Sequence, residues 1–381
     1  MEITSVKVFR VTPPGDEWLW LAVETDQGVT GWGECSHTGA DDLVAHALYD
    51  LSDSLIGLEP EIAISEMARI RDGGYPKMHG GFVVSAAWSA MDQALWDLVG
   101  QNLRIPLYRL LGAFGRNKVP VYANLNRGLR GNRSSEALAN AGLEAMRSGF
   151  SFVKCTPFDE VTESADFNTA KRGLERFEAL ASVVLPSQIA VDCHQRFNRV
   201  SFSRLLTYLR SRSVYPYWLE DPVVSRDWGE LLELRRFYPE FLLAGGETCL
   251  NFHELWQLGA TKLVQILMPD VKYFGGISLL KSLIPVIEEY GLKISLHNPS
   301  GPISTAVSAH LSAMSTKPVP LEFPYGVVAD RDQATIPAEP IADGVYHLSD
   351  RPGLGITVNP EYLLQYGFEW KDGQWKSCRR S

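Results

Sequence analysis

Three short apolar runs that each end on a carboxylate decide the fold: IAVD (189–192), YWLE (217–220) and FLLAGGE (241–247). Runs this short and this continuously apolar are typical of strands in a parallel sheet that is covered on both faces. Their terminal acids follow one another at intervals of 28 and 27 residues. A strand, a crossover helix and their loops need a length of that order. The three runs therefore predict successive β–α units of one parallel sheet.

The same alternation continues on both sides of these runs, over about 200 residues in all. Segments with helical periodicity lie between several of the runs. Strands that alternate with helices in this way predict a (β/α) barrel of the triosephosphate isomerase type. The further strand-like runs are VPVYA (119–123), SFVK (151–154), KLVQILMPD (262–270), LKISLH (292–297) and VPLEF (319–323).

The two ends of the chain follow a different pattern. Residues 3–11 and 18–26 alternate like strands of a small antiparallel meander, and residues 85–101 have the period of a helix. The final residues are rich in Pro, Gly and Asp and break the alternation of the barrel. We therefore expect an α+β capping domain at 1–117, a barrel at 118–328, and a tail at 329–381 that folds back on the capping domain.

The composition is that of an ordinary globular chain, with 45% hydrophobic and 21% charged residues among 381. The net charge of −9 makes nucleic acid and anionic membranes poor partners. The amino-terminal residues do not resemble a signal peptide, and no apolar run approaches the roughly 18 residues of a membrane span. The cysteines form no CxxC pair and favour reduced thiols. We expect a cytoplasmic protein. The cysteines are Cys35, Cys155, Cys193, Cys249 and Cys378.

Nearly every predicted barrel strand ends on a polar residue. The carboxyl ends of barrel strands surround one mouth, so these side chains should converge on a single site. Any one of them could be an ordinary strand-end charge, but that explanation fits the complete set poorly. The residues are Asn124, Lys154, Asp192, Glu220, Glu247, Asp270, His297 and Glu322.

Asp192, Glu220 and Glu247 follow three successive strands. In a shared, partly buried site their charges would repel one another and raise one another's pKa values. A divalent cation removes this repulsion, and an all-oxygen ligand set with room for water and substrate suits Mg²⁺ better than Zn²⁺. The alternative is structural: the carboxylates could form salt bridges with arginines of the barrel.

Asp270 and His297 end the next two strands. A carboxylate that accepts a hydrogen bond from one imidazole nitrogen fixes the tautomer of the ring and raises the basicity of the other nitrogen. This pair is therefore a candidate general base. A lone histidine is more often structural, but the adjacent metal site and Asp270 favour the catalytic interpretation.

Several motifs in this order resemble those of the enolase superfamily, mandelate racemase subgroup, over essentially the whole chain. The resemblance implies a capping domain completed by the tail, a (β/α)₇β barrel, and Mg²⁺ on the three carboxylates. It also implies that the Asp270–His297 dyad removes a proton α to a carboxylate, giving a metal-stabilised enediolate, and that the chain forms dimers or octamers. The motifs are GWGE (31–34), AMDQALWDLVGQ (90–101), LYRLLGA (107–113), VDCH (191–194), LEDP (219–222), GGET (245–248), PDVKYFGGIS (269–278) and HNPSGP (297–302).

Departures from the subgroup's patterns narrow the activity. Racemases of the subgroup carry Lys-x-Lys where this chain has Lys154-Cys155-Thr156, so a second lysine base is missing. Cycloisomerases place a lysine where this chain has Asp270, so muconate lactonisation is disfavoured. The pattern Asp192-Cys193-His194 is similar to that of acid-sugar dehydratases of the galactonate type, in which this histidine is the general acid.

The remaining strand-end residues also have expected roles. His194 could instead be a hydrogen-bonding neighbour of the metal ligand. Lys154 would place positive charge near the substrate carboxylate. Glu322 resembles a residue of the subgroup that hydrogen-bonds a carboxylate oxygen, and it would stabilise the enediolate if it were protonated.

Substrate contacts are expected from two capping-domain loops, 13–19 and 73–82, and from polar residues at the barrel rim. Taken singly, residues of the capping loops are more often ordinary loop residues than substrate contacts. The rim offers more hydrogen-bonding groups than an aromatic substrate would need, which favours a polyhydroxylated acid. The candidates are Trp18, Tyr75 and His79 from the capping loops, and Asn124, Asn126, Arg127, Thr156, Gln195, Arg196, Asn298 and Tyr325 from the rim.

These observations predict a Mg²⁺-dependent dehydratase of an aldonic or aldaric acid. His297 would take the C2 proton, His194 would protonate the departing 3-hydroxyl, and the product would be a 2-keto-3-deoxy acid. An epimerase or a lactone cycloisomerase could use the same enediolate. A protein that keeps the fold and the metal but only binds a ligand is the alternative from another class.

Overall fold

The computed structural model describes residues 1–72, 81–162, 166–223 and 228–379. Within them, parallel strands are ordered β10-β9-β8-β7-β6-β5-β4, and β11 pairs with the other side of β4. Between β11 and β10, the Ser295 hydroxyl donates to Pro320 O at 2.8 Å. The predicted barrel is confirmed. Its strands are β4 (Lys118–Asn124), β5 (Val153–Cys155), β6 (Ile189–Asp192), β7 (Trp218–Glu220), β8 (Leu243–Gly245), β9 (Ile266–Leu267), β10 (Lys293–Ile294) and β11 (Leu321–Pro324).

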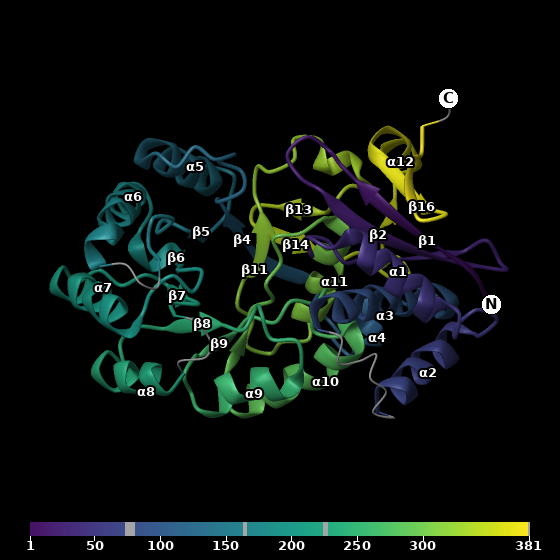
Figure 1. Cartoon of the computed structure of the whole chain (residues 1–381), viewed down its shortest axis with the longest axis horizontal. Coiled ribbons are helices and arrows are strands. Elements are labelled where there is room, and N and C mark those ends of the chain that lie inside the picture. Colours follow the sequence, from purple (N-terminus) through teal and green to yellow (C-terminus); the bar gives the residue numbers. More distant parts are fainter. Residues whose placement is uncertain (73–80, 163–165, 224–227, 380–381) are drawn as a thin grey trace.

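Helices connect these strands and surround them (Figure 1). Several begin at side chains that accept hydrogen bonds from the first turn: Ser134 accepts from Ala137 N, and Asn251 accepts from Glu254 N. Asn198 forms a reciprocal capping box with Ser201. The helices are α5 (Ser135–Arg147), α6 (Lys171–Ala181), α7 (Arg199–Ser211), α8 (Trp228–Phe237), α9 (Phe252–Ala260), α10 (Gly276–Glu289) and α11 (Pro302–Ser312).

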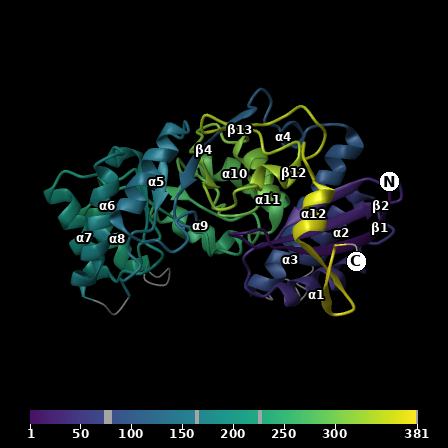
Figure 2. The ribbon, with the colours of Figure 1, turned by 90° about the horizontal axis from the view of Figure 1, so that it is seen from above.

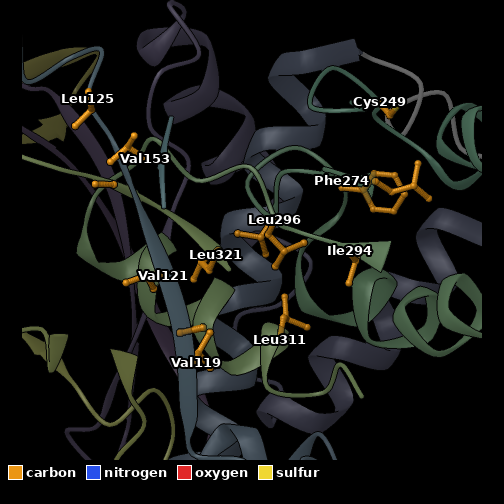
Figure 3. Close-up of a cluster of buried hydrophobic side chains, with 14 of the residues drawn as sticks. Val119, Val121, Leu125, Val153, Cys249, Phe274, Ile294, Leu296, Leu311 and Leu321 are labelled. Carbon is orange, nitrogen blue, oxygen red and sulfur yellow. The ribbon is translucent and has the colours of Figure 1, made fainter. Parts of the chain in front are cut away.

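Alternation along each strand separates two apolar layers. One set of strand residues, including Val121, Val153 and Leu321, packs in the large cluster that contains the helix side chains (Figure 3). The other set packs in a separate small cluster with Tyr122, Ala190 and Trp218. Side chains two residues apart on a strand point to the same side. The second set is therefore followed, two residues further along each strand, by Asn124, Asp192 and Glu220. The apolar cluster thus forms a floor, and the polar strand ends lie above it.

The cap is an antiparallel sheet in the order β17-β16-β1-β2-β3, with α1 and α3 against one face (Figure 2). The sequence pattern indicates strands at 3–11 and 18–26 and a helix only at 85–101, but helix α1 already begins at Asp41. Its buried residues Val44, Ala45 and Leu48 have helical spacing, and two aspartates lie in its first turn. The elements are β1 (Ile3–Val11), β2 (Trp18–Thr25), β3 (Thr30–Glu34), α1 (Asp41–Ser52), α2 (Pro60–Asp72), α3 (Gly81–Leu103), β16 (Gly367–Lys371) and β17 (Gln374–Ser377).

The tail has two parts. Strand β14 (Val345–His347) pairs with the first half of β4, and β13 (Ile341–Ala342) pairs with β14. After β12 (Thr335–Ile336), β15 (Thr357–Val358) and α12 (Pro360–Tyr366), strand β16 pairs with β1 and completes the capping sheet, as expected. The exact domain boundaries at 117 and 328 stay predictions. Among the described helices, none has both the length and the hydrophobicity to cross a membrane.

Close contact between β3 and α3 explains the glycines of the GWGE segment. A Cβ atom on Gly33 would overlap the carbonyl oxygen of Ala90, and one on Gly31 would overlap that of Ala94, one helical turn further on. We expect Gly33→Ala to lower the free energy of unfolding by about 2–3 kcal/mol, because strand or helix must shift. Urea unfolding measures this change. Gly229→Ala is the matched control, since a Cβ there meets nothing within 4 Å; an equal effect in both variants would contradict the packing argument.

Candidate active site

The three predicted metal ligands lie together at the mouth of the barrel. Asp192 and Glu220 end β6 and β7, and Glu247 follows β8. One oxygen from each carboxylate lies within 4.8 Å of the others. The Asp192 and Glu220 side chains are buried, whereas Glu247 is 20% exposed. Three converging carboxylates with one partly open side suit a hard divalent cation that keeps positions for water or substrate.

Lys154 places a buried ammonium among these carboxylates. Its Nζ lies 2.8 Å from Glu220 Oε1, 2.8 Å from Glu322 Oε1 and 3.4 Å from Asp192 Oδ2. Burial opposes charge on Lys154, but the carboxylates raise its pKa well above the usual value. Burial also opposes charge on Asp192, yet Lys154 and His194 lower the pKa of this residue. Burial, aided by the neighbouring acids, raises the pKa of Glu220 to about 8 despite Lys154.

Glu322 at the end of β11 is bound from three sides. Its Oε1 accepts from Asn124 Nδ2 at 2.6 Å and lies near Lys154, and its Oε2 accepts from the Asn298 backbone N–H at 2.8 Å. Burial would raise the pKa of Glu322, but Lys154, His297 and the Asn298 N–H lower it. The structure therefore favours the ionised form, in contrast to the protonated form considered from the sequence. The physical reason is the ammonium group beside it.

The candidate base, His297, is held in place by Asp270, which Lys272 holds in turn. His297 Nδ1 lies 2.8 Å from Asp270 Oδ2, and His297 Nε2 lies 3.1 Å from Glu247 Oε2. Lys272, which the sequence analysis did not single out, donates from its backbone N and its Nζ to the Asp270 carboxylate at 2.8 and 2.5 Å. Burial would lower the pKa of His297, but Glu247 and Asp270 raise it to about 9. Asp270 is thus held in one orientation and fixes the imidazole through Nδ1.

The candidate acid, His194, lies beside a different carboxylate of the same group. His194 has a left-handed backbone, with φ of 46°, and its Nε2 lies 3.1 Å from Asp192 Oδ2. Its side chain is 43% exposed. Burial would lower the pKa of His194, but Asp192 raises it. His194 and His297 therefore contact different members of the carboxylate cluster.

The predicted substrate residues of the rim are mostly engaged with other protein groups. Thr156 bonds Asn126, Arg196 Nη1 donates to Asp159 O at 2.9 Å, and Asn298 bonds Thr305 and Glu322 O. Tyr325 lies outside the strand ring, with its hydroxyl 3.1 Å from Ser148 Oγ and its ring against Phe150. These contacts position the strand ends and leave direct substrate contact by these residues a prediction.

The capping-loop candidates fall into two groups. Trp18 is fully buried, stacks on Trp20 and Tyr362, and donates from Nε1 to Asp16 Oδ2 at 2.9 Å. Trp18 therefore helps to fix the 13–19 loop through Asp16. Tyr75 and His79 lie outside the described residues.

Glu34, a residue that the sequence pattern does not single out, has a side chain that is fully buried between cap and barrel. Its carboxylate accepts from the backbone N–H groups of Gly301 and Ser304, at 2.7 and 2.9 Å. It thereby caps the amino terminus of α11, just after the loop that carries His297. Glu34 is part of the GWGE segment, so the motif marked the residue without indicating its partner.

The fold and site define a barrel protein with a capping domain, a candidate carboxylate metal site and a histidine–aspartate pair at the barrel mouth. The chain belongs to the mandelate racemase/muconate lactonizing enzyme family. A family model for the amino-terminal domain of these enzymes matches residues 6–112, and one described as enolase C-terminal domain-like matches residues 137–362.

Similar proteins cover the whole chain. A D-galactonate dehydratase from Pectobacterium atrosepticum is 28% identical over 398 residues, covering 99% of this chain and 98% of the relative. A second, from Ralstonia pickettii, is 28% identical with the same coverage. An enolase structure from Agrobacterium radiobacter, named as a candidate galactarate dehydratase with sodium and L-malate bound, superimposes with a TM-score of 0.81 at 26% identity, covering 98% of this chain and 99% of that chain.

Proposed function

We propose that this protein is a Mg²⁺-dependent hydro-lyase that dehydrates an aldonic or aldaric acid to a 2-keto-3-deoxy acid. The observation that carries this proposal is the pair of imidazoles on one carboxylate cluster. His297 is supported by Asp270 and His194 contacts Asp192, so one ring can serve as base and the other as acid. Relatives named D-galactonate dehydratase, aligned along their whole length, support the same reaction class.

The donor set fits the proposed ion, because Asp192, Glu220 and Glu247 offer hard oxygen ligands within one ion's reach. When bound there, Mg²⁺ would supply positive charge for the substrate carboxylate. Lys154 adds a fixed ammonium on the same side of the mouth, since it lies within 3.4 Å of two of these ligands. We further propose a homo-oligomer, dimer or octamer, in the cytoplasm.

The reaction then divides between the two histidines. His297 Nε2 removes the proton from C2, and the electron pair of that bond passes toward the carboxylate as an enediolate. The enediolate expels the 3-hydroxyl, to which the His194 ring gives a proton, so that water leaves. The resulting enol takes a proton at C3 from solvent and becomes the 2-keto-3-deoxy acid. The net change is loss of one water, with no oxidant or reductant.

The direct test is a screen of hexonates, pentonates and hexarates, including D-galactonate and galactarate, with Mg²⁺ and semicarbazide detection of 2-keto products. The proposal expects a 2-keto product from at least one acid. Absence of product from every acid would refute dehydration. Return of C2-inverted acid would instead favour an epimerase, and opening of a lactone ring would favour a cycloisomerase.

His194→Asn should separate the two half-reactions. Removing the acid slows departure of the hydroxyl but leaves the base, so we expect dehydration to fall by about a hundredfold or more while C2-proton exchange in D₂O persists. Exchange is followed by proton NMR and dehydration by the semicarbazide assay. His253→Asn, a change at an exposed histidine of α9, is the matched control. Unchanged dehydration in the His194 variant would exclude this residue as the acid.

A further inference from the structure

The loop that follows His297 is held residue by residue by charged side chains from three parts of the chain. Arg127, after β4, donates to Pro299 O at 2.8 Å. Arg331, in the tail, donates to Ser300 O at 2.7 Å. Glu34, in the cap, accepts from Gly301 N–H at 2.7 Å. The position of the candidate base therefore depends on groups outside its own strand.

Arg127 also contacts two side chains of the capping domain, and one of them, Asp16, lies in the 13–19 loop. Its Nη2 donates to Asp16 Oδ1, and its Nη1 lies 2.9 Å from His37 Nε2. The Asp16 side chain is completely covered, whereas Arg127 is 35% exposed. Burial opposes charge on Asp16, but His37 and Arg127 lower the pKa of this carboxyl, so it is ionised. The contact is thus a charge-assisted bond with a buried carboxylate.

The 13–19 loop is itself packed onto the barrel at this point. Gly15 has φ of 107°, and a Cβ atom there would overlap Val327 O, just beyond β11. Figure 1 shows the turn between β1 and β2 extending toward the end of β11. Trp18 holds the other oxygen of Asp16. The loop, Asp16, Arg127 and Pro299 therefore form one continuous chain of contacts that ends two residues from His297.

We infer that Arg127 is a positioning residue that couples the 13–19 loop of the cap to the loop that carries His297. The guanidinium fork is suited to this role because it can bond Asp16 and Pro299 O at the same time. With Asp16 in place, Arg127 is directed at Pro299 and the 297–301 loop is held. With Asp16 removed, this restraint on the base is lost. The inference rests on the proposed function only in assigning His297 as the base.

The test measures backbone hydrogen exchange in the full chain without substrate, so it does not depend on the reaction being correctly assigned. The wild type is compared with Asp16→Asn, Arg127→Met and the double variant. We expect both single variants to speed exchange in residues 298–304 by about tenfold or more, as loss of a charge-assisted bond implies. The double variant should add little beyond either single change, because both changes break the same connection.

Arg133→Met is the matched control. Arg133 lies in the same loop after β4, is similarly exposed at 33%, and pairs with Asp159 at 3.1 Å instead of with the cap. Backbone hydrogen exchange in residues 298–304 of this variant should match that of the wild type. Unchanged exchange in Asp16→Asn, additive effects in the double variant, or an equal effect of Arg133→Met would each overturn the inference.

Kinetics separate positioning from general stability. With the acid that reacts fastest in the screen, Arg127→Met should lower kcat by about tenfold or more with a smaller change in KM, because a displaced base slows the chemical step. Arg127→Lys keeps the charge but offers one ammonium nitrogen in place of the two guanidinium nitrogens that bond Asp16 and Pro299 O, so its kcat should be intermediate. Full activity in Arg127→Met would overturn the inference. A failed screen would count against the proposed function, while the exchange data would still decide the coupling.

Discussion

Replacing His297 with Asn is expected to lower C2-proton exchange and dehydration together, by about a thousandfold or more, since both steps need the general base. The position of the His297 ring explains this expectation. His297 Nε2 faces the carboxylate cluster at 3.1 Å from Glu247, and its Nδ1 is fixed by Asp270 at 2.8 Å. Exchange into D₂O and semicarbazide detection measure the two rates on the same samples.

Two further variants make this result specific. Asp270→Asn should also lower both rates strongly, because an amide can stabilise the wrong tautomer of His297. His347→Asn, at an exposed position of β14, should leave both rates unchanged. If His297→Asn retained more than about a tenth of wild-type exchange, another residue would be the base.

Lys154→Met is expected to lower the free energy of unfolding of the metal-free protein by about 3–5 kcal/mol, because it removes a buried cation and leaves its carboxylate partners uncompensated. Nζ lies within 3.4 Å of Asp192, Glu220 and Glu322, and all four side chains are almost completely buried. Mg²⁺ should stabilise this variant more than the wild type, since the ion would restore positive charge to the cluster. Urea unfolding with and without Mg²⁺ gives both quantities.

Lys293→Met is the control for this experiment, because Lys293 is an exposed residue at the other end of a barrel strand. We expect almost no change in its unfolding curve or in its response to Mg²⁺. If Lys154→Met were as stable as the wild type, or gained nothing extra from Mg²⁺, the carboxylates would not repel one another strongly enough to need a cation among them.

The barrel and its carboxylate cluster could be predicted from the sequence because both follow from short-range pattern. A parallel strand between two apolar layers has a recognisable run of residues, and alternation then fixes which strand-end residue faces the mouth. Asp192, Glu220 and Lys154 are such positions, and the structure places them together. Helix α1 was missed because its hydrophobic spacing covers only a few turns and follows a stretch of strong strand signals.

Contacts between distant segments could not be predicted from the same pattern. Trp18 belongs to the segment 13–19, whose composition suggests a substrate contact, but it begins strand β2 and is buried against Tyr362 in the tail. Tyr325 follows a barrel strand, yet its ring packs against Phe150 outside the mouth. The partners of Arg127 lie 111 and 172 residues away along the chain. Side-chain direction in loops depends on such neighbours, which a single sequence does not identify.

Product analysis in D₂O tests the central claim most directly. The protein is incubated with Mg²⁺ and each acid of the panel, beginning with D-galactonate, and the products are identified by NMR. The proposed reaction predicts a 2-keto-3-deoxy acid that carries one solvent-derived deuterium at C3, formed by the wild type and lost in His297→Asn. Recovery of C2-exchanged or C2-inverted acid without any ketone would contradict it, as would equal ketone formation by the two proteins.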